Sequence, residues 1–197
     1  MKNFARIRHV RLCKMTHGCI IAALIAVRPI CLSAQDAQYS EYEVKAALLE
    51  KFARFIEWPD HTAAGASDSD KRFVVGVIGE NPFGSILETM YVRQTINGRR
   101  VEVRYLSSVD EVEGCHILFI AQSESHRISQ ILRQTFDRPI LTVSDYQGYT
   151  KKGVLITFFV TNGQIRFEIN QQAVRQSGLY VSSLLLNLSK PASEEAK

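Results

Sequence analysis

The stretch FVVGVIGENPFG, residues 73–84, decides the fold class of this chain. Its first six residues, Phe73–Ile78, are almost continuously apolar, which is typical of a strand buried on both faces of a parallel sheet. Asn81 and Pro82 then have the residue types of a helix cap and a first-turn proline, so a helix is predicted from there to about Val92. A buried strand that runs directly into a helix indicates an α/β architecture.

Strands and helices continue to alternate downstream. An Asn97-Gly98 turn precedes the next strand, and a short connection over 107–114 precedes the one after it. Interleaved strands and helices predict a largely parallel central sheet with flanking helices. The predicted strands cover 101–106, 117–121 and 140–143, and a helix that starts at Ser123 or Ser125 buries Ile128, Ile131, Leu132 and Phe136.

The C-terminal part differs in kind. Two strand patterns, 154–160 and 164–169, flank Asn162-Gly163, which is a strong β-hairpin signal. The second of them alternates apolar and polar residues, as expected for an antiparallel strand near a sheet edge. Two helices over 170–177 and 180–188 follow, with Gly178 between them. We expect one domain over 35–190 and a disordered polar tail over 191–197.

An amphipathic helix is predicted ahead of the sheet, over 41–58. Its apolar stripe is Val44, Leu48, Phe52 and Phe55, widened by Leu49 and Ile56. Ser40 and Glu43 have the spacing of a capping box, and Trp58-Pro59 predicts the end of the helix. The small, polar residues 60–72 predict an exposed loop.

Residues 1–34 have the parts of a cleaved secretory signal. Five basic residues precede the apolar run 19–27, Arg28 and Pro29 end it, and Ala34 suits the cleavage position. Nine apolar residues are too few to cross a bilayer, which needs about 20. We therefore expect export from the cytoplasm, with a mature chain that begins near Gln35 and does not insert into the membrane.

Removal of this segment changes the charge of the protein. The whole chain has 24 basic and 20 acidic residues, and six of the bases but none of the acids lie in 1–34. The mature chain therefore has a formal charge of −2, which does not favour nucleic-acid binding. Three of the four cysteines also leave with the signal, so Cys115 has no disulfide partner within the mature chain.

A search for catalytic chemistry favours structural explanations. The Gly79–Ser85 turn has the glycine spacing of a phosphate loop but lacks its Lys and Ser/Thr, so no nucleotide cofactor is predicted. No two of His61, His116 and His126 have the spacing of joint metal ligands, and no metal is predicted. Cys115 is interpreted as a small buried hydrophobe. Successive strand residues face opposite sides of a sheet, so its side chain need not meet that of His116.

A hydrolase site built on serine is an alternative interpretation of the 123–126 segment. Ser123 and Ser125 lie close to His126, but no Gly-x-Ser-x-Gly elbow is present. Helix capping is the simpler interpretation of the two serines.

Six segments, in register over nearly all of the mature chain, resemble the YfiR-like family. They are VKAALLEKFARFIEWP (44–59), GVIGENPFG (76–84), INGRRVEVR (96–104), CHILFIAQSE (115–124), ILTVSD (140–145) and IRFEINQQAVRQSGLYVSSLLLNLS (165–189). The resemblance implies a periplasmic α/β protein without catalytic activity that represses a membrane-bound diguanylate cyclase through its periplasmic sensor domain, and so limits cyclic di-GMP and biofilm formation. It also implies an outer-membrane lipoprotein as a second partner, and a chain that can form a homodimer. Only Cys115 is retained here, which puts disulfide-based redox control in doubt.

Three functional hypotheses follow, and the first is an inhibitory binding protein. Its partner surface is expected at Phe55 and Trp58 of the first helix and at Arg166 and Glu168 of the hairpin. The second is a small-ligand sensor with a pocket where parallel strands end, because open α/β sheets bind ligands there. The residues at those ends are Glu80, Asn81, Ser123 and Asp145. The third is an enzyme that uses Ser123 or Cys115 beside a histidine.

Overall fold

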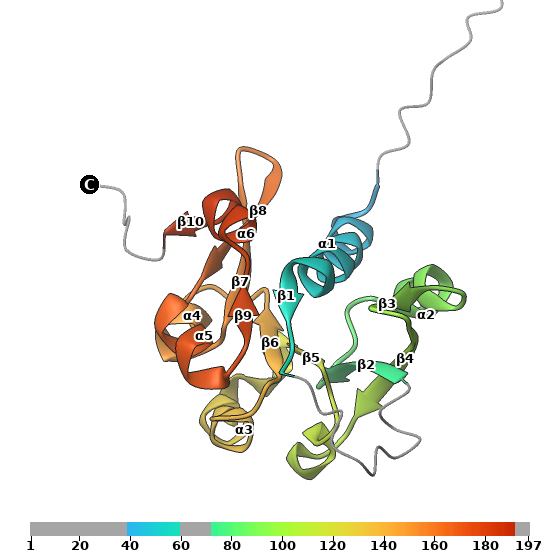
Figure 1. Cartoon of the computed structure of the whole chain (residues 1–197), viewed down its shortest axis with the longest axis horizontal. Coiled ribbons are helices and arrows are strands. Elements are labelled where there is room, and N and C mark those ends of the chain that lie inside the picture. The colour runs from blue at the N-terminus through green and yellow to red at the C-terminus, as the bar shows by residue number, and fades with distance from the viewer. Residues whose placement is uncertain (1–38, 60–71, 192–197) are drawn as a thin grey trace, which may run out of the picture. The chain divides into compact units, whose positions relative to one another are not determined.

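The computed structural model describes residues 39–59 and 72–191, and Figure 1 shows how their helices and strands are arranged. The helices are α1 (Glu41–Phe55), α2 (Ile86–Tyr91), α3 (Ile128–Thr135), α4 (Tyr149–Lys152), α5 (Gln171–Ser177) and α6 (Ser183–Leu188), with 3₁₀ turns η2 (Val109–Val112) and η3 (Gln122–His126). The strands are β1 (Ile56–Glu57), β2 (Arg72–Ile78), β3 (Thr95–Ile96), β4 (Arg99–Leu106), β5 (Ile117–Ile120), β6 (Leu141–Ser144), β7 (Ile156–Thr161), β8 (Gln164–Ile169), β9 (Tyr180–Val181) and β10 (Lys190–Pro191).

A mixed sheet forms the centre of this single α/β domain. Within the described residues its strand order is β10-β8-β7-β6-β5-β2-β4-β3. The β7–β8 hairpin and the β3–β4 hairpin are antiparallel, and the other neighbouring strands pair in parallel. The prediction of a largely parallel sheet with a C-terminal hairpin followed by helices is confirmed.

Both faces of the sheet are covered. Along β2, Phe73, Val75 and Val77 belong to the apolar cluster that contains the buried side of α1. The alternate residues Val74 and Ile78 belong to a second cluster that contains the buried side of α3. This arrangement explains why the β2 sequence is apolar at nearly every position rather than at every second one.

The chain leaves β2 and its neighbour β5 toward opposite faces. After β2 the chain forms α2, whose Leu87 and Tyr91 are buried in the cluster on the α1 side. After β5 it forms α3, whose Ile128 and Ile131 are buried in the other cluster. Two adjacent parallel strands whose exits diverge in this way define a topological switch point, where α/β sheets leave a crevice.

Helix α1 begins as predicted and ends three residues early. The Ser40 hydroxyl accepts from Glu43 N at 3.2 Å, and the Glu43 carboxylate accepts from Ser40 N at 2.6 Å. The helix stops at Phe55 because Ile56 and Glu57 pair with β9 in a two-stranded antiparallel ribbon. The predicted helix over 41–58 is thus wrong for its last turn, and the predicted helix over 180–188 is wrong at Tyr180–Val181, which form β9.

The predicted helix at Asn81 starts later, at Ile86. Instead of capping a helix, the Asn81 carboxamide accepts from Phe83 N at 2.9 Å and donates to Gly84 O at 2.8 Å. These bonds hold a turn, and Gly84 has a φ of +56° that interrupts right-handed helical geometry. The prediction was wrong because an asparagine that can cap a helix can equally form an Asx turn, in which its side chain bonds to the backbone of its own loop.

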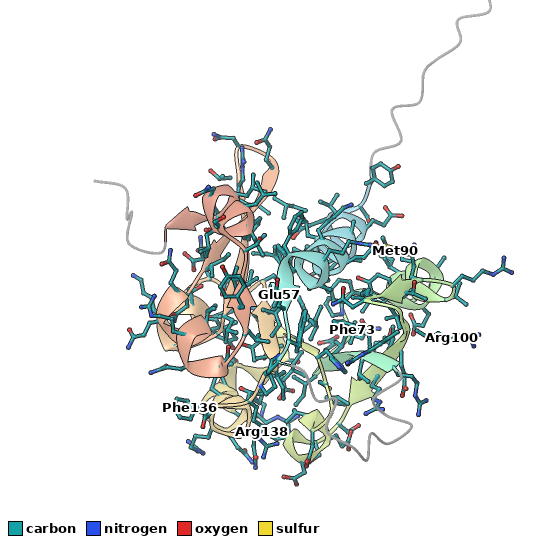
Figure 2. All side chains as sticks on the ribbon, in the orientation of Figure 1. Glu57, Phe73, Met90, Arg100, Phe136 and Arg138 are labelled. Atoms are coloured by element: carbon teal, nitrogen blue, oxygen red, sulfur yellow. The ribbon has the colours of Figure 1, made fainter. Side chains whose placement is uncertain are left out.

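The helix expected from Ser123 or Ser125 is also split. Residues 122–126 form η3, and α3 starts only at Ile128. Neither segment has a side-chain cap, so the capping role assigned to the two serines was wrong. Phe136, predicted in the apolar stripe, follows the last residue of α3 and is 64% exposed (Figure 2).

Both Asn-Gly turns are confirmed. Asn97 and Gly98 have φ values of +52° and +76°, and Asn162 and Gly163 have values of +51° and +71°. Two successive positive φ angles are what a tight hairpin between twisted strands requires. Gly178, with a φ of +74°, ends α5 as predicted.

Several predictions concern residues outside the described ranges. They are the secretory signal over 1–34, the exposed loop over 60–71, and the tail over 192–197. Arg72 and Pro191, which were assigned to that loop and that tail, belong to β2 and β10. Within 39–59 and 72–191, none of the helices is long and apolar enough to cross a membrane.

Candidate functional site

A crevice of about 430 Å³ lies where β2, β5 and β6 end. Three polypeptide segments that follow these strands contribute to its wall, and the first half of α1 supplies the rest. Its lining residues are Glu41, Tyr42, Lys45, Glu80, Asn81, Pro82, Ala121, Gln122, Ser123 and Asp145. The volume falls within the range of about 300–1,000 Å³ that is usual for small-molecule sites.

The loops that follow β2 and β5 are bonded to each other at the crevice. The Ser123 hydroxyl accepts from Glu80 N at 2.9 Å. Gly79 has a φ of +94°, and a Cβ atom there would lie only 2.5 Å from Ser123 Oγ. A residue with a side chain would therefore disturb this junction, so glycine at position 79 is a geometric requirement.

A buried ammonium group forms the wall that belongs to α1. Lys45 is 3% exposed, and its Nζ lies 2.6 Å from Asp145 Oδ2 and 2.5 Å from Glu41 Oε1. The same nitrogen lies 4.3 Å from the centre of the Tyr42 ring. Two carboxylates and an aromatic face together compensate for the desolvation of this charge.

Tyr42 is hydrogen-bonded to the Asp145 carboxylate as well. Its hydroxyl donates to Asp145 Oδ2 at 2.9 Å, so that one oxygen accepts from both Tyr42 and Lys45. Burial, followed by the negative charge of Asp145, raises the pKa of the Tyr42 phenol far above its usual value. The phenol therefore stays protonated and remains a donor, and it helps to fix the first turns of α1 to the end of β6.

The four residues predicted for a ligand pocket all line this crevice. Glu80 and Asn81 come from the loop after β2, Ser123 from the loop after β5, and Asp145 from the end of β6. Asn81 contributes mainly by holding its own turn, because both ends of its carboxamide are bonded within the loop.

Sequence reasoning missed the part of the crevice that α1 contributes. Lys45 precedes Leu49 by four residues and Phe52 by seven, and thus lies on the side of α1 that is buried. A lysine on a buried helical face must find an anionic partner, and this rule was the available signal. The partner itself could not be read from the sequence, since Asp145 is 100 residues away.

The predicted partner-binding residues lie in two separate places. Phe55 and Trp58 are partly buried against the core, and the Trp58 ring packs edge-on against Phe73 with centroids 5.2 Å apart. Arg166 and Glu168 lie on β8 on either side of Phe167, whose ring packs on Phe52 of α1 with centroids 4.9 Å apart, so their side chains face the side of the sheet away from α1. The structure therefore does not bring the two pairs together.

The two residues on β8 also differ from each other. The exposed Arg166 donates to Gln164 Oε1 at 2.8 Å, whereas the half-buried Glu168 accepts from the Thr150 hydroxyl. Arg166 is thus available to a partner, and Glu168 is already used within the domain.

The other reactive groups are placed as follows. Cys115 is buried in the cluster that contains α3, and burial raises its pKa to about 11, so it is a protonated thiol at neutral pH. As predicted, His116 points to the opposite face. There its ring stacks on Phe73 with centroids 4.6 Å apart. His126 Nδ1 lies 3.0 Å from the backbone carbonyl oxygen of Ser123, so this bond joins the imidazole to the main chain and not to the serine hydroxyl. Within 39–59 and 72–191, no three His, Cys, Asp or Glu side chains are grouped so that they could hold a metal ion.

The fold and the crevice define a mixed α/β domain with a polar recess at its switch point. The chain belongs to the YfiR/HmsC-like family, whose model matches residues 42–190. This match covers the domain from the first turn of α1 to the start of β10. The family is a regulatory, non-catalytic one of periplasmic proteins that act with a partner signalling protein, and membership supports a regulator of diguanylate cyclase activity in general terms.

Proposed function

We propose that this protein represses a membrane-bound diguanylate cyclase by binding the periplasmic sensor domain of that enzyme. The observation that supports the proposal most is the family match over 42–190. The mechanism is differential binding: a repressor that contacts only the inactive conformation of the sensor shifts the sensor population toward that conformation. Lower cyclic di-GMP and less biofilm follow. An outer-membrane lipoprotein that sequesters the repressor, and a homodimer, are further partners that we include in this proposal.

The surface that we propose for the sensor domain is centred on the end of α1. In the β1–β9 ribbon, Glu57, which lies between Phe55 and Trp58 in the sequence, pairs with Tyr180, and Tyr180 is 65% exposed. Leu184 and Leu188, four residues apart on α6, are also exposed. Large apolar side chains that are exposed next to each other, as Leu184 and Leu188 are one helical turn apart, are typical of protein-binding surfaces. Arg166 is proposed as a separate, polar contact.

The test is intracellular cyclic di-GMP after deletion of the gene. We expect cyclic di-GMP to rise, and a copy with residues 1–34 to restore the low level while a copy without them does not. A Leu184→Glu copy should restore it poorly because a carboxylate interrupts the apolar surface, whereas Lys51→Glu, on the exposed side of α1, should restore it fully. An unchanged cyclic di-GMP level in the deletion strain, with the protein shown to be present in the parent, argues against repression.

A second function is proposed for the crevice, as a site where a small ligand sets the strength of repression. The observation that favours it is the position of α1. Tyr42 and Lys45 of this helix line the crevice, and its last residue, Phe55, is part of the proposed partner surface. A ligand that changes how α1 is held at one end can thus change the partner surface at the other. The test is whether a compound that binds the crevice changes the affinity of the purified protein for the sensor domain.

A further inference from the structure

The crevice has an excess of negative charge. Its lining includes the carboxylates of Glu41, Glu80 and Asp145 but only one cationic side chain, Lys45. Lys45 is already paired with Glu41 and Asp145. Glu80 is exposed, and among the described residues its carboxylate has no hydrogen bond or ion pair. A ligand in this crevice therefore meets an uncompensated anion.

The groups left for a ligand are mostly acceptors. Asp145 Oδ2 receives both Lys45 and Tyr42, and the second oxygen of this carboxylate receives neither. The phenol oxygen of Tyr42 donates its proton to Asp145 and keeps its lone pairs. The carboxamide of Gln122, the first residue of η3, adds an acceptor and a donor. A donor-rich ligand satisfies this set better than an anion does.

The surroundings of Lys45 show that the wall of the crevice can stabilise an ammonium group. The Lys45 ammonium group is almost fully buried, between two carboxylates and above the ring of Tyr42. Carboxylates combined with an aromatic face are the usual means of recognising organic ammonium groups. A metal ion suits the crevice less well, since no group of three acidic or imidazole ligands forms in the part of the chain that the structure describes.

We propose that the crevice binds a compact organic cation, with its primary ammonium or guanidinium group between Glu80 and Asp145. The hydrocarbon part of the ligand lies toward Tyr42 and Pro82, which are also part of the lining. This inference rests on the second proposed function, the ligand-controlled crevice, and adds the chemical class of the ligand. It is independent of whether the partner is a cyclase.

The experiment uses the protein purified after export and three probes of equal chain length: n-butylamine, 1-butanol and sodium butyrate. Binding is followed by amide ¹H–¹⁵N chemical shifts, at a constant ionic strength of about 0.15 M so that general screening is equal. We expect n-butylammonium alone to shift Gly79–Asn81 and Gln122–Ser123 in a saturable way.

Two matched variants remove the same charge at different places. Glu80→Gln takes away the free carboxylate of the crevice, and Glu113→Gln takes away an exposed carboxylate just before β5, at the other end of that strand. For an exposed ion pair we expect Glu80→Gln to raise the Kd for n-butylammonium about three- to fivefold, with Glu113→Gln near the wild-type value. Asp145 is left unchanged because it also holds α1.

The outcomes separate this inference from the function on which it rests. If butyrate or 1-butanol shifts the same amides as strongly, or if Glu80→Gln binds n-butylammonium as the wild type does, the cationic class is wrong and the crevice remains a ligand site. If none of the probes shifts these amides, both the class and the second proposed function are rejected. The cyclic di-GMP measurement still tests the first.

Discussion

Replacement of Lys45 by methionine tests the arrangement that holds α1 to the sheet. Methionine keeps the unbranched stem of lysine but lacks its terminal ammonium group, so it removes the charge and the hydrogen bond to Asp145. Removing one partner of a fully buried ion pair costs about 3–5 kcal/mol, because the other charge is left buried and unpaired. Asp145 is 13% exposed and keeps its bond from Tyr42, so the cost here is lower. The Glu41 contact adds only about 0.3–0.5 kcal/mol, since that carboxylate is 49% exposed.

From these terms we expect Lys45→Met to lower the free energy of unfolding by about 2–3 kcal/mol. Urea denaturation at pH 7 measures it, and an unchanged m-value shows that the unfolded state is comparable. Lys51→Met, an exposed lysine of the same helix, should change stability by less than about 0.5 kcal/mol.

The double variant with Asp145→Asn supplies the decisive comparison. With both charges absent, no buried carboxylate is left unpaired, so the double variant should be more stable than the two single losses predict. A coupling energy of about 1–2 kcal/mol is expected from this cycle. Strictly additive losses, or a Lys45→Met protein as stable as Lys51→Met, refute the reasoning that the pair is buried and interacting.

Three further predictions concern single positions. Gly79→Ala should lower the free energy of unfolding, measured in urea, by about 3 kcal/mol, because its φ is +94° and the new Cβ meets Ser123 Oγ. Gly84→Ala should cost only about 1–2 kcal/mol, because its φ is +56° and the space around it is open. Equal losses would contradict the proposed close approach at Gly79. Burial raises the pKa of Cys115 from about 9 to about 11, so the thiol contributes stability that is complete below pH 9 and is lost as the pH rises toward 11. Unfolding midpoints of wild type and Cys115→Ala should therefore converge over this interval, and midpoints that stay parallel would show that the thiol is not desolvated. Phe136→Gln should change stability by less than about 0.5 kcal/mol because the ring is exposed, and a loss above about 2 kcal/mol would show that it is part of the core.

The fold could be predicted largely because its signals are local. An uninterrupted apolar strand such as Phe73–Ile78, the two Asn-Gly turns and the Ser40–Glu43 capping box each specify their own geometry within a few residues. The errors fall where a distant segment decides the outcome. Ile56 and Glu57 leave the helical pattern only because β9, more than 120 residues later, is available to pair with them.

The candidate site was likewise predictable in the part that follows from the parallel strands. Glu80, Ser123 and Asp145 follow strands that are parallel, and parallel strands bring their carboxyl ends to one edge of the sheet. Which helix covers that edge depends on how the chain crosses the sheet, which periodicity alone does not determine. Tyr42 and Lys45 were therefore assigned to a packing helix, although they form one wall of the crevice.

Because α1 lines the crevice at one end and the proposed partner surface at the other, binding at the two sites should be energetically coupled. If a cation in the crevice weakens binding of the sensor domain by some factor, the sensor domain must weaken binding of the cation by the same factor, because linkage is reciprocal. The contacts that could carry this coupling are the bonds of Lys45 and Tyr42 to Asp145 at one end of α1, and the β1–β9 pairing at the other. Lys45→Met should then reduce the coupling factor toward one even where each ligand still binds alone. A coupling that survives this substitution unchanged would have to pass through the strands rather than through α1.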